Sequence, residues 1–130
     1  MTTKYGNILC DADFLIALYV NTDSNHAQAT EIYNQNNNFA ILNITLYEIS
    51  TVLSRLFEHK IAKKTLIDIQ DLFLNIITFD QSMEKNTFSL YYQLDKKNIS
   101  FFDCACLSVA KKNNWKIASF DKFYPPEILV

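Results

Sequence analysis

The sequence predicts an α/β fold, a three-layer sandwich in which helices cover both faces of a central parallel sheet. Short apolar stretches alternate along the chain with longer segments whose apolar residues recur at helical spacing. Strands that are separated by helices of this length run parallel, because a helical crossover returns the chain to the same end of the sheet. Strands of such a sheet are apolar on both sides, as these stretches are.

The elements follow in a regular order. The expected strands cover 7–10, 39–42, 76–79 and 115–119. The expected helices cover 14–20, a segment from the cap residues DSNH to about Asn36, then 45–57, 62–76, 83–94 and 102–110. No linker or internal repeat interrupts this order, so we expect one domain over residues 1–130.

Composition places the chain among ordinary globular proteins, with 49% hydrophobic residues over 130 positions. Its longest uninterrupted apolar run, 14–20, is far shorter than the roughly 20 residues that a membrane span needs. The polar start, MTTKYGN, has no apolar signal core behind it. Three cysteines are an odd number for a disulfide framework. We therefore expect a cytoplasmic protein without a membrane segment.

Charge and glycine content exclude two classes of function. The net charge is −2 and there is no basic tail, which argues against binding nucleic acid by bulk charge. Gly6 is the only glycine, and both the Rossmann fingerprint and the P-loop need several. Nucleotide cofactors held in either way are therefore excluded.

Acidic residues follow two of the expected strands directly. Asp11 comes after the first strand and Asp121 after the last, and ligands of open parallel sheets bind beyond the carboxyl ends of the strands. Glu48 lies near the start of one expected helix and Asp103 near the start of another. The alternative explanations are structural: Asp103 completes a capping box after Ser100, and Asp121 caps a short turn. Together, the four indicate one acidic crevice.

Such a crevice needs a counter-charge. Two carboxylates about 5 Å apart repel by about 3 kcal/mol at an effective dielectric constant of about 20. Arg55 is the only arginine in the chain, so few cationic side chains are available. Mg²⁺ commonly binds to one or two carboxylates together with water and phosphate oxygens. The pattern therefore predicts a divalent metal site that hydrolyses phosphoesters.

The segments ILCDADFLIAL, TLYEIS and FFDCACLSVAKKNNWKIASFDKFY resemble, in order, the motifs of the PIN domain, and most of all those of small VapC-like toxin ribonucleases. The resemblance implies an α/β/α sandwich and cleavage of RNA with Mg²⁺ or Mn²⁺. It also implies a homodimer and a small antitoxin partner. The residues that it implies for the acidic cluster are Asp11, Glu48, Asp103 and Asp121, with Ser119 as a supporting hydroxyl.

Asp13 departs from the resemblance, because PIN domains usually have Asn, Ser or Thr at this position. We expect Asp13 to cap its helix and hold water beside the metal; the alternative is a metal ligand. Asp11 and Asp13 together also resemble the nucleophile motif of haloacid-dehalogenase-like phosphatases, although Leu15 stands where that family has a small hydroxyl residue. A catalytically silent PIN-like interaction module is a third hypothesis.

Two expectations concern contacts with other molecules. Lys116 and Lys122 lie closest in sequence to Asp121, and we expect them either to contact the RNA backbone or to form a solvated face. The helices expected at 45–57 and 62–76 have wide apolar faces that either mark an interface or bury each other. These faces comprise Ile49, Val52, Leu53, Leu56, Phe57, Leu66, Ile69, Leu72, Phe73 and Leu74.

Overall fold

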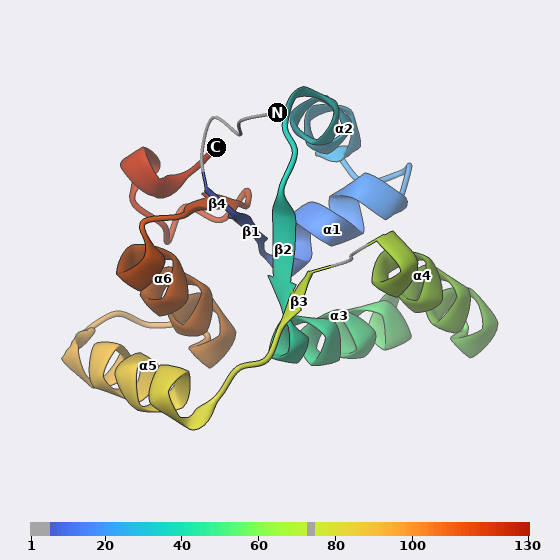
Figure 1. The fold of residues 1–130 in the computed structure, drawn as a ribbon. Helices are drawn as coiled ribbons and strands as arrows, with labels where there is room; N and C mark the ends of the chain where they lie inside the picture. The colour runs from blue at the N-terminus through green and yellow to red at the C-terminus, as the bar shows by residue number, and fades with distance from the viewer. Residues whose placement is uncertain (1–5, 73–74) are drawn as a thin grey trace.

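A central sheet of parallel strands organises the computed structural model, which describes residues 6–72 and 75–130. The strand order is β3-β2-β1-β4, and all pairs are parallel. The strands are β1 (Ile8–Cys10), β2 (Phe39–Leu42), β3 (Ile76–Ile77) and β4 (Lys116–Ala118). Each matches an expected strand, and the predicted α/β/α sandwich is confirmed (Figure 1).

Helices cover both faces of this sheet (Figure 1). On one face lie α1 (Ala12–Tyr19), α2 (His26–Gln35), α3 (Asn43–Leu56) and α4 (His59–Leu72). On the other face lie α5 (Gln81–Gln93) and α6 (Phe101–Asn113), followed after β4 by a short 3₁₀ helix, η1 (Pro126–Ile128). Each face has its own apolar core, so β1, which contributes residues to both, is buried along its whole length.

The position of β1 determines what lies at the carboxyl edge of the sheet. Cys10 at the end of β1 pairs with Ala118 at the end of β4, so these strands end side by side. The backbone N–H of Asp11 extends this pairing by one step, donating to the carbonyl of Ala118 at 3.0 Å. Residues that follow the two strands are therefore neighbours, although more than 100 positions separate them in the chain.

The helix expected at 62–76 differs from the structure. It is α4, which begins at His59 and ends at Leu72, and Ile76 belongs to β3. Phe73 and Leu74, which we assigned to its apolar face, lie outside the described residues. The strand expected at 76–79 is shortened to two residues, because the chain leaves the sheet edge after Ile77 to reach α5.

Helices α3 and α4 pack against each other, which buries part of their apolar faces. Ile49, Leu53 and Ile69 are fully buried there. Leu56 on α3 and Ile61 and Ile67 on α4 remain 57%, 49% and 44% exposed. Mutual burial therefore accounts for much of the predicted surface but not for all of it. No helix in the described ranges is long and apolar enough to cross a bilayer.

Candidate active site

Asp11 is a buried carboxylate at the junction of β1 and α1, only 3% exposed. Its Oδ1 atom caps α1 by accepting from the N–H of Ala12 at 2.9 Å. Its Oδ2 atom accepts from the hydroxyl of Tyr124 at 3.0 Å and lies 3.1 Å from that of Ser119, a second available donor. Neutral donors thus surround a group that would otherwise be expensive to bury.

These neutral donors do not replace a cation. Burial raises the pKa of Asp11, and the nearby charge of Asp121 raises it further, whereas the three hydrogen bonds lower it. Tyr124 itself is 2% exposed, and its hydroxyl needs a partner because it is buried. The sequence analysis did not find Tyr124; the only signal would have been an aromatic residue shortly after Asp121 that carries a polar group into the core.

Asp13 lies in the first turn of α1 and turns toward the end of β4. Its Oδ2 accepts from the N–H of Phe120 at 3.1 Å, and both of its oxygens lie within 3.2 Å of Ser119 Oγ. The expectation that Asp13 caps α1 is wrong: Asp11 is the N-cap, since its side chain accepts from Ala12. Asp13 instead joins α1 to the loop after β4.

Ser119 faces two carboxylates with one hydroxyl hydrogen. Its Oγ lies 3.1 Å from Asp11 Oδ2 and 3.1 Å from Asp13 Oδ1, so it donates to only one of them at a time. Burial, and next the charge of Asp11, raise the pKa of Asp13 to about 6. Ser119 therefore lies between two acids that repel each other. The sequence resemblance had assigned it the role of a supporting hydroxyl.

Asp121 lies two residues further along this loop. Its N–H donates to Ser119 Oγ at 3.0 Å, and its Oδ1 accepts from the N–H of Phe123 at 2.9 Å. The second bond caps a turn, as the structural explanation of Asp121 predicted. The same carboxylate raises the pKa values of Asp11 and Asp103 through its charge, so it also belongs to the acidic group.

Glu48 approaches the same place from α3, the helix that begins directly after β2. Its Oε1 atom is buried and has no hydrogen-bond partner. Burial raises the pKa of Glu48 to about 7, and the charges of Asp11, Asp13 and Asp121 contribute in the same direction. Buried polar atoms in folded proteins usually have a hydrogen-bond partner, so this oxygen is available to bind a cation or a donor.

Asp103 is the third residue of α6, whose N-cap Ser100 accepts from the N–H of Phe102 at 3.0 Å. Burial raises the pKa of Asp103 to about 8, followed by the charges of Asp11, Asp121 and Glu48 and by a hydrogen bond with Asp121. The structure therefore brings all of the predicted acidic residues, and Asp13, into one electrostatically coupled group.

The donor set of this group fits a hard divalent cation in its chemistry. It offers carboxylate oxygens, and the buried Oε1 of Glu48 has no hydrogen-bond partner. The one ion pair in the described ranges joins Lys64 and Asp68 on α4, so it does not involve these acids. In residues 6–72 and 75–130, no three acidic, histidine or cysteine side chains already converge as metal ligands would. Binding of a cation would have to draw more of these side chains together, and its charge would offset their mutual repulsion.

The two predicted lysines lie in different places. Lys116 begins β4, at the opposite end of the strand from Ser119, and its Nζ donates to the carbonyl of Glu127. This position gives no support to a contact between Lys116 and a substrate at the acids. Lys122 directly follows Asp121 and is exposed, so its substrate contact stays a prediction.

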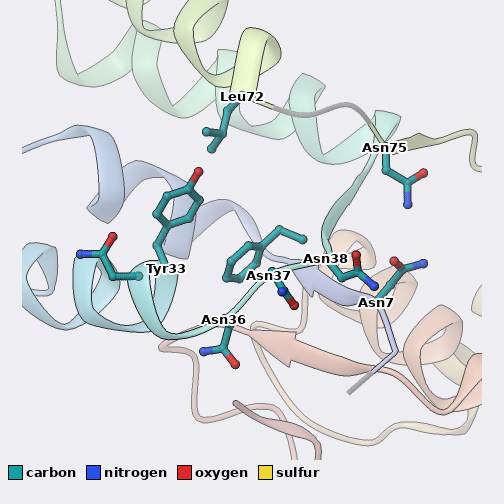
Figure 2. Close-up of a pocket in the computed structure, with 9 residues that line it drawn as sticks. Asn7, Tyr33, Asn36, Asn37, Asn38, Leu72 and Asn75 are labelled. Atoms are coloured by element: carbon teal, nitrogen blue, oxygen red, sulfur yellow. The ribbon is translucent and has the colours of Figure 1, made fainter. Parts of the chain in front are cut away.

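A separate hollow of about 520 Å³ lies at the other edge of the sheet. Its lining includes Asn7 before β1, Asn38 before β2 and Asn75 before β3 (Figure 2). These residues precede their strands, whereas Asp11 and Asp121 follow theirs. None of the described residues that line the hollow is acidic, so it is not part of the candidate site.

Comparison with protein families identifies the architecture that carries these acids. The family model of the PIN domain matches residues 8–124, which include every acidic residue of the site. The chain belongs to the PIN domain family. The predicted resemblance is thereby confirmed. No curated protein matches the chain significantly by sequence.

Solved structures share the PIN fold with this chain. VapC20 of Mycobacterium tuberculosis, a toxin that cleaves the sarcin-ricin loop, has a TM-score of 0.78 at 22% identity, covering 89% of this chain and 91% of VapC20. A toxin–antitoxin complex from Klebsiella pneumoniae has a TM-score of 0.65 at 20% identity, with 95% and 96% covered. VapBC2 from Rickettsia felis, bound to a fragment of its promoter DNA, has a TM-score of 0.67 at 20% identity, with 94% and 95% covered.

Proposed function

We propose that this PIN domain is a metal-dependent endoribonuclease and the toxin of a toxin–antitoxin pair. The observation that carries the proposal is the coupled acidic group at the carboxyl edge of the sheet, in which burial and mutual repulsion raise the pKa values of Asp11, Asp13, Glu48 and Asp103. A protein retains such an arrangement at a cost in stability, which is typical of functional sites. Nucleases of the PIN family generally use a divalent metal ion, and VapC20 is a toxin that cleaves the sarcin-ricin loop.

Asp11, Asp103, Asp121 and Glu48 are the residues that would hold Mg²⁺ or Mn²⁺. When bound, the ion would neutralise the acids, lower the pKa of water and stabilise charge on the scissile phosphate. The unpartnered Oε1 of Glu48 is the oxygen that gains most from a cation, because it has no competing hydrogen bond. One oxygen of Asp121 accepts a hydrogen bond from the N–H of Phe123, which fixes the orientation of the carboxylate.

The surrounding side chains hold these acids in place. Ser119 connects Asp11 and Asp13 through its hydroxyl and accepts from the backbone of Asp121. Tyr124 holds the second oxygen of Asp11 from within the core. We assign Asp13 a supporting role beside the metal ligands, because its oxygens already lie against Ser119 and Phe120 N–H.

The products of the reaction test this chemistry. Attack by water on phosphorus does not use the ribose 2′-OH, so RNA fragments should carry 5′-phosphate and 3′-OH ends. Cleavage should require Mg²⁺ or Mn²⁺ and stop in EDTA. Fragments with 2′,3′-cyclic phosphate ends, or full activity in EDTA, would contradict the proposal.

The two other hypotheses have less support. A haloacid-dehalogenase-like phosphatase needs Asp13 as a free acid/base beside the nucleophile Asp11, yet Asp13 is occupied by hydrogen bonds to Ser119 and Phe120. Such an enzyme would hydrolyse p-nitrophenyl phosphate and lose this activity on substitution of Asp11 or Asp13. A silent interaction module would process neither substrate.

We include a homodimer and a small antitoxin in the proposal. The support from this chain is the exposed apolar surface of α3 and α4, which includes Leu56, Ile61 and Ile67. Among proteins of the same fold, the Klebsiella pneumoniae structure is a toxin–antitoxin complex. An antitoxin that places an arginine among the acids would supply the counter-charge that they lack and silence the site.

Two observations test the partners separately. Light scattering on the purified chain at tens of micromolar should give the mass of a dimer, and a clean monomer would count against it. A short open reading frame immediately upstream should encode a small protein with a basic C-terminal segment. Its absence would favour a free-standing nuclease.

A further inference from the structure

An exposed group of aromatic side chains lies where α5 meets the start of α6. We call it the aromatic patch and define it as Phe88, Tyr91, Tyr92 and Phe101. Phe88, Tyr91 and Tyr92 are 39%, 41% and 76% exposed, although aromatic rings are among the side chains with most to gain from burial. Neither the fold nor the acidic site accounts for this exposure.

The rings of the aromatic patch form a continuous surface. The Phe88 ring stacks on that of Tyr92, with a distance of 5.8 Å between ring centroids and an interplanar angle of 29°. The centroids of the Phe88 and Phe101 rings are 4.7 Å apart. The centroid of the Tyr91 ring lies 6.4 Å from that of Tyr92 and 6.5 Å from that of Phe101. The rings therefore hold one another in place, while Tyr92, the most exposed, keeps most of its surface in solvent.

The aromatic patch adjoins the acidic site through the first turn of α6. Phe101 and Asp103 are two residues apart in this turn, about 3 Å along the helix axis, so their backbones are close while their side chains project from different faces of α6. The Phe101 ring also contacts that of Phe79, and the N–H of Phe79 donates to the side chain of Asn43 directly after β2. The patch thus continues the carboxyl edge of the sheet on the β3 side, where α5 and α6 lie together (Figure 1).

Lysines flank the aromatic patch. Lys85 lines a surface hollow of about 740 Å³ on α5 together with Phe88 and Tyr92, and Lys96 and Lys97 follow the end of α5. Glu84 and Asp95 are the acidic residues between Gln81 and Ser100, so this segment has three lysines and two acids. Glu84 lines the same hollow as Lys85, and Asp80 caps α5, so the lysines offer individual contacts to phosphate groups and no net positive charge.

We propose that the aromatic patch is a stacking platform for the bases of a single-stranded RNA whose backbone passes the acidic site. The inference rests on the proposed ribonuclease function and adds the form in which the substrate is bound. Exposed aromatic rings beside lysines are the combination that binds single strands without sequence preference, because every base has a face on which it can stack. Paired bases in a duplex do not offer their faces, so the platform selects unpaired RNA at the site.

The test measures binding of a fluorescein-labelled 12-nucleotide single-stranded RNA in an Asp121→Asn background with Mn²⁺ present, where cleavage does not interfere. Tyr92→Ala should weaken binding by about 5- to 140-fold, the loss expected for one stacked base. Tyr92→Phe should bind as the background does, because the ring remains. Gln28→Ala, which truncates an exposed side chain on α2, outside both the aromatic patch and the apolar surface of α3 and α4, is the control and should have no effect. The same RNA in duplex form should bind more weakly and should not respond to Tyr92→Ala.

Parallel cleavage of the same RNA by the wild-type chain separates the possible failures. If the wild type cleaves and Tyr92→Ala binds like its background, the stacking inference fails and the proposed function stands. If the wild type neither binds nor cleaves, both fail. A change in molar mass on Tyr92→Ala, measured by light scattering, would show that the aromatic patch joins two copies of the chain, and would overturn the inference.

Discussion

Tyr124 and Asp11, separated by 113 positions in the chain, are joined by a buried hydrogen bond of 3.0 Å from the tyrosine hydroxyl to Oδ2 of the aspartate. Both side chains are almost fully buried. The bond connects the turn after β4 to the residue that follows β1 and caps α1, so it ties the acidic site to the core. The buried carboxylate of Asp11 thereby gains a hydrogen-bond donor that carries no charge.

Tyr124→Phe should destabilise the folded chain by about 1.5–3 kcal/mol, the cost of removing a hydrogen bond to a charged group. Burial raises the pKa of Asp11, and its ionised fraction rises with pH, so the loss in urea unfolding should be larger at pH 8 than at pH 4. Tyr92→Phe removes an exposed hydroxyl and serves as the control, with a change within about 0.5 kcal/mol. Equal losses at both pH values would argue that Tyr124 acts by packing alone.

The metal-free chain should lose stability as pH rises from about 4 to about 8. The pKa values of Asp13, Glu48 and Asp103 are raised to about 6, 7 and 8, so the folded state binds more protons in this range than the unfolded state. Stability therefore falls with rising pH until these groups are ionised. Thermal unfolding in EDTA measures the effect, and addition of Mn²⁺ at pH 8 should reverse it. A midpoint that stays level or rises between pH 5 and 8 would contradict the repulsion argument.

Asp103→Asn should raise the thermal midpoint of the metal-free chain at pH 8 while lowering RNA cleavage by at least about 100-fold, since loss of even an indirect metal contact costs 10- to 100-fold. The substitution relieves repulsion from Asp11, Asp121 and Glu48.

Asp11→Asn should behave differently, because Asp11 accepts from the three donors described above and an amide has only one acceptor oxygen. This variant should be inactive and destabilised by about 1–3 kcal/mol. Stabilisation by both substitutions would refute the distinction.

Lys122→Ala should reduce the salt dependence of RNA binding by about one unit of slope if the side chain neutralises a phosphate. Lys116→Ala is the matched control, because Lys116 lies at the other end of β4 beside Glu127. Its slope should equal that of the unmodified chain. Fluorescence titrations over a range of salt concentrations measure both, and equal slopes for all three proteins would remove Lys122 from the site.

The positions of the acids at strand ends could be predicted from the sequence because they follow from one rule of topology. Asp11 and Asp121 each come directly after an apolar stretch, and parallel strands end at the same edge. Strand order was not needed, only the fact that both strands belong to one sheet. Glu48 and Asp103 were included from their positions near helix starts, and the resemblance supported them, because a helical glutamate or a first-turn aspartate is common outside active sites.

Contacts set by side-chain direction could not be predicted in the same way. Tyr124 gave no periodic signal, because it lies in an irregular turn and its role depends on the close approach of β4 to β1. Asp13 was assigned to a cap because capping is a local rule, yet its partners Ser119 and Phe120 lie more than 100 positions away. Lys116 is close to Asp121 in sequence, but the length of β4 separates them in space.

The most direct test of the central claim, that the coupled acids form a metal site for RNA hydrolysis, is RNA cleavage under single-turnover conditions as a function of Mn²⁺ concentration, for the wild type and Asp121→Asn. The account predicts saturable, metal-dependent cleavage by the wild type and none by the variant at any Mn²⁺ concentration, with both proteins folded by circular dichroism. Equal cleavage by the two proteins, or wild-type cleavage that does not depend on Mn²⁺ or Mg²⁺, would contradict it.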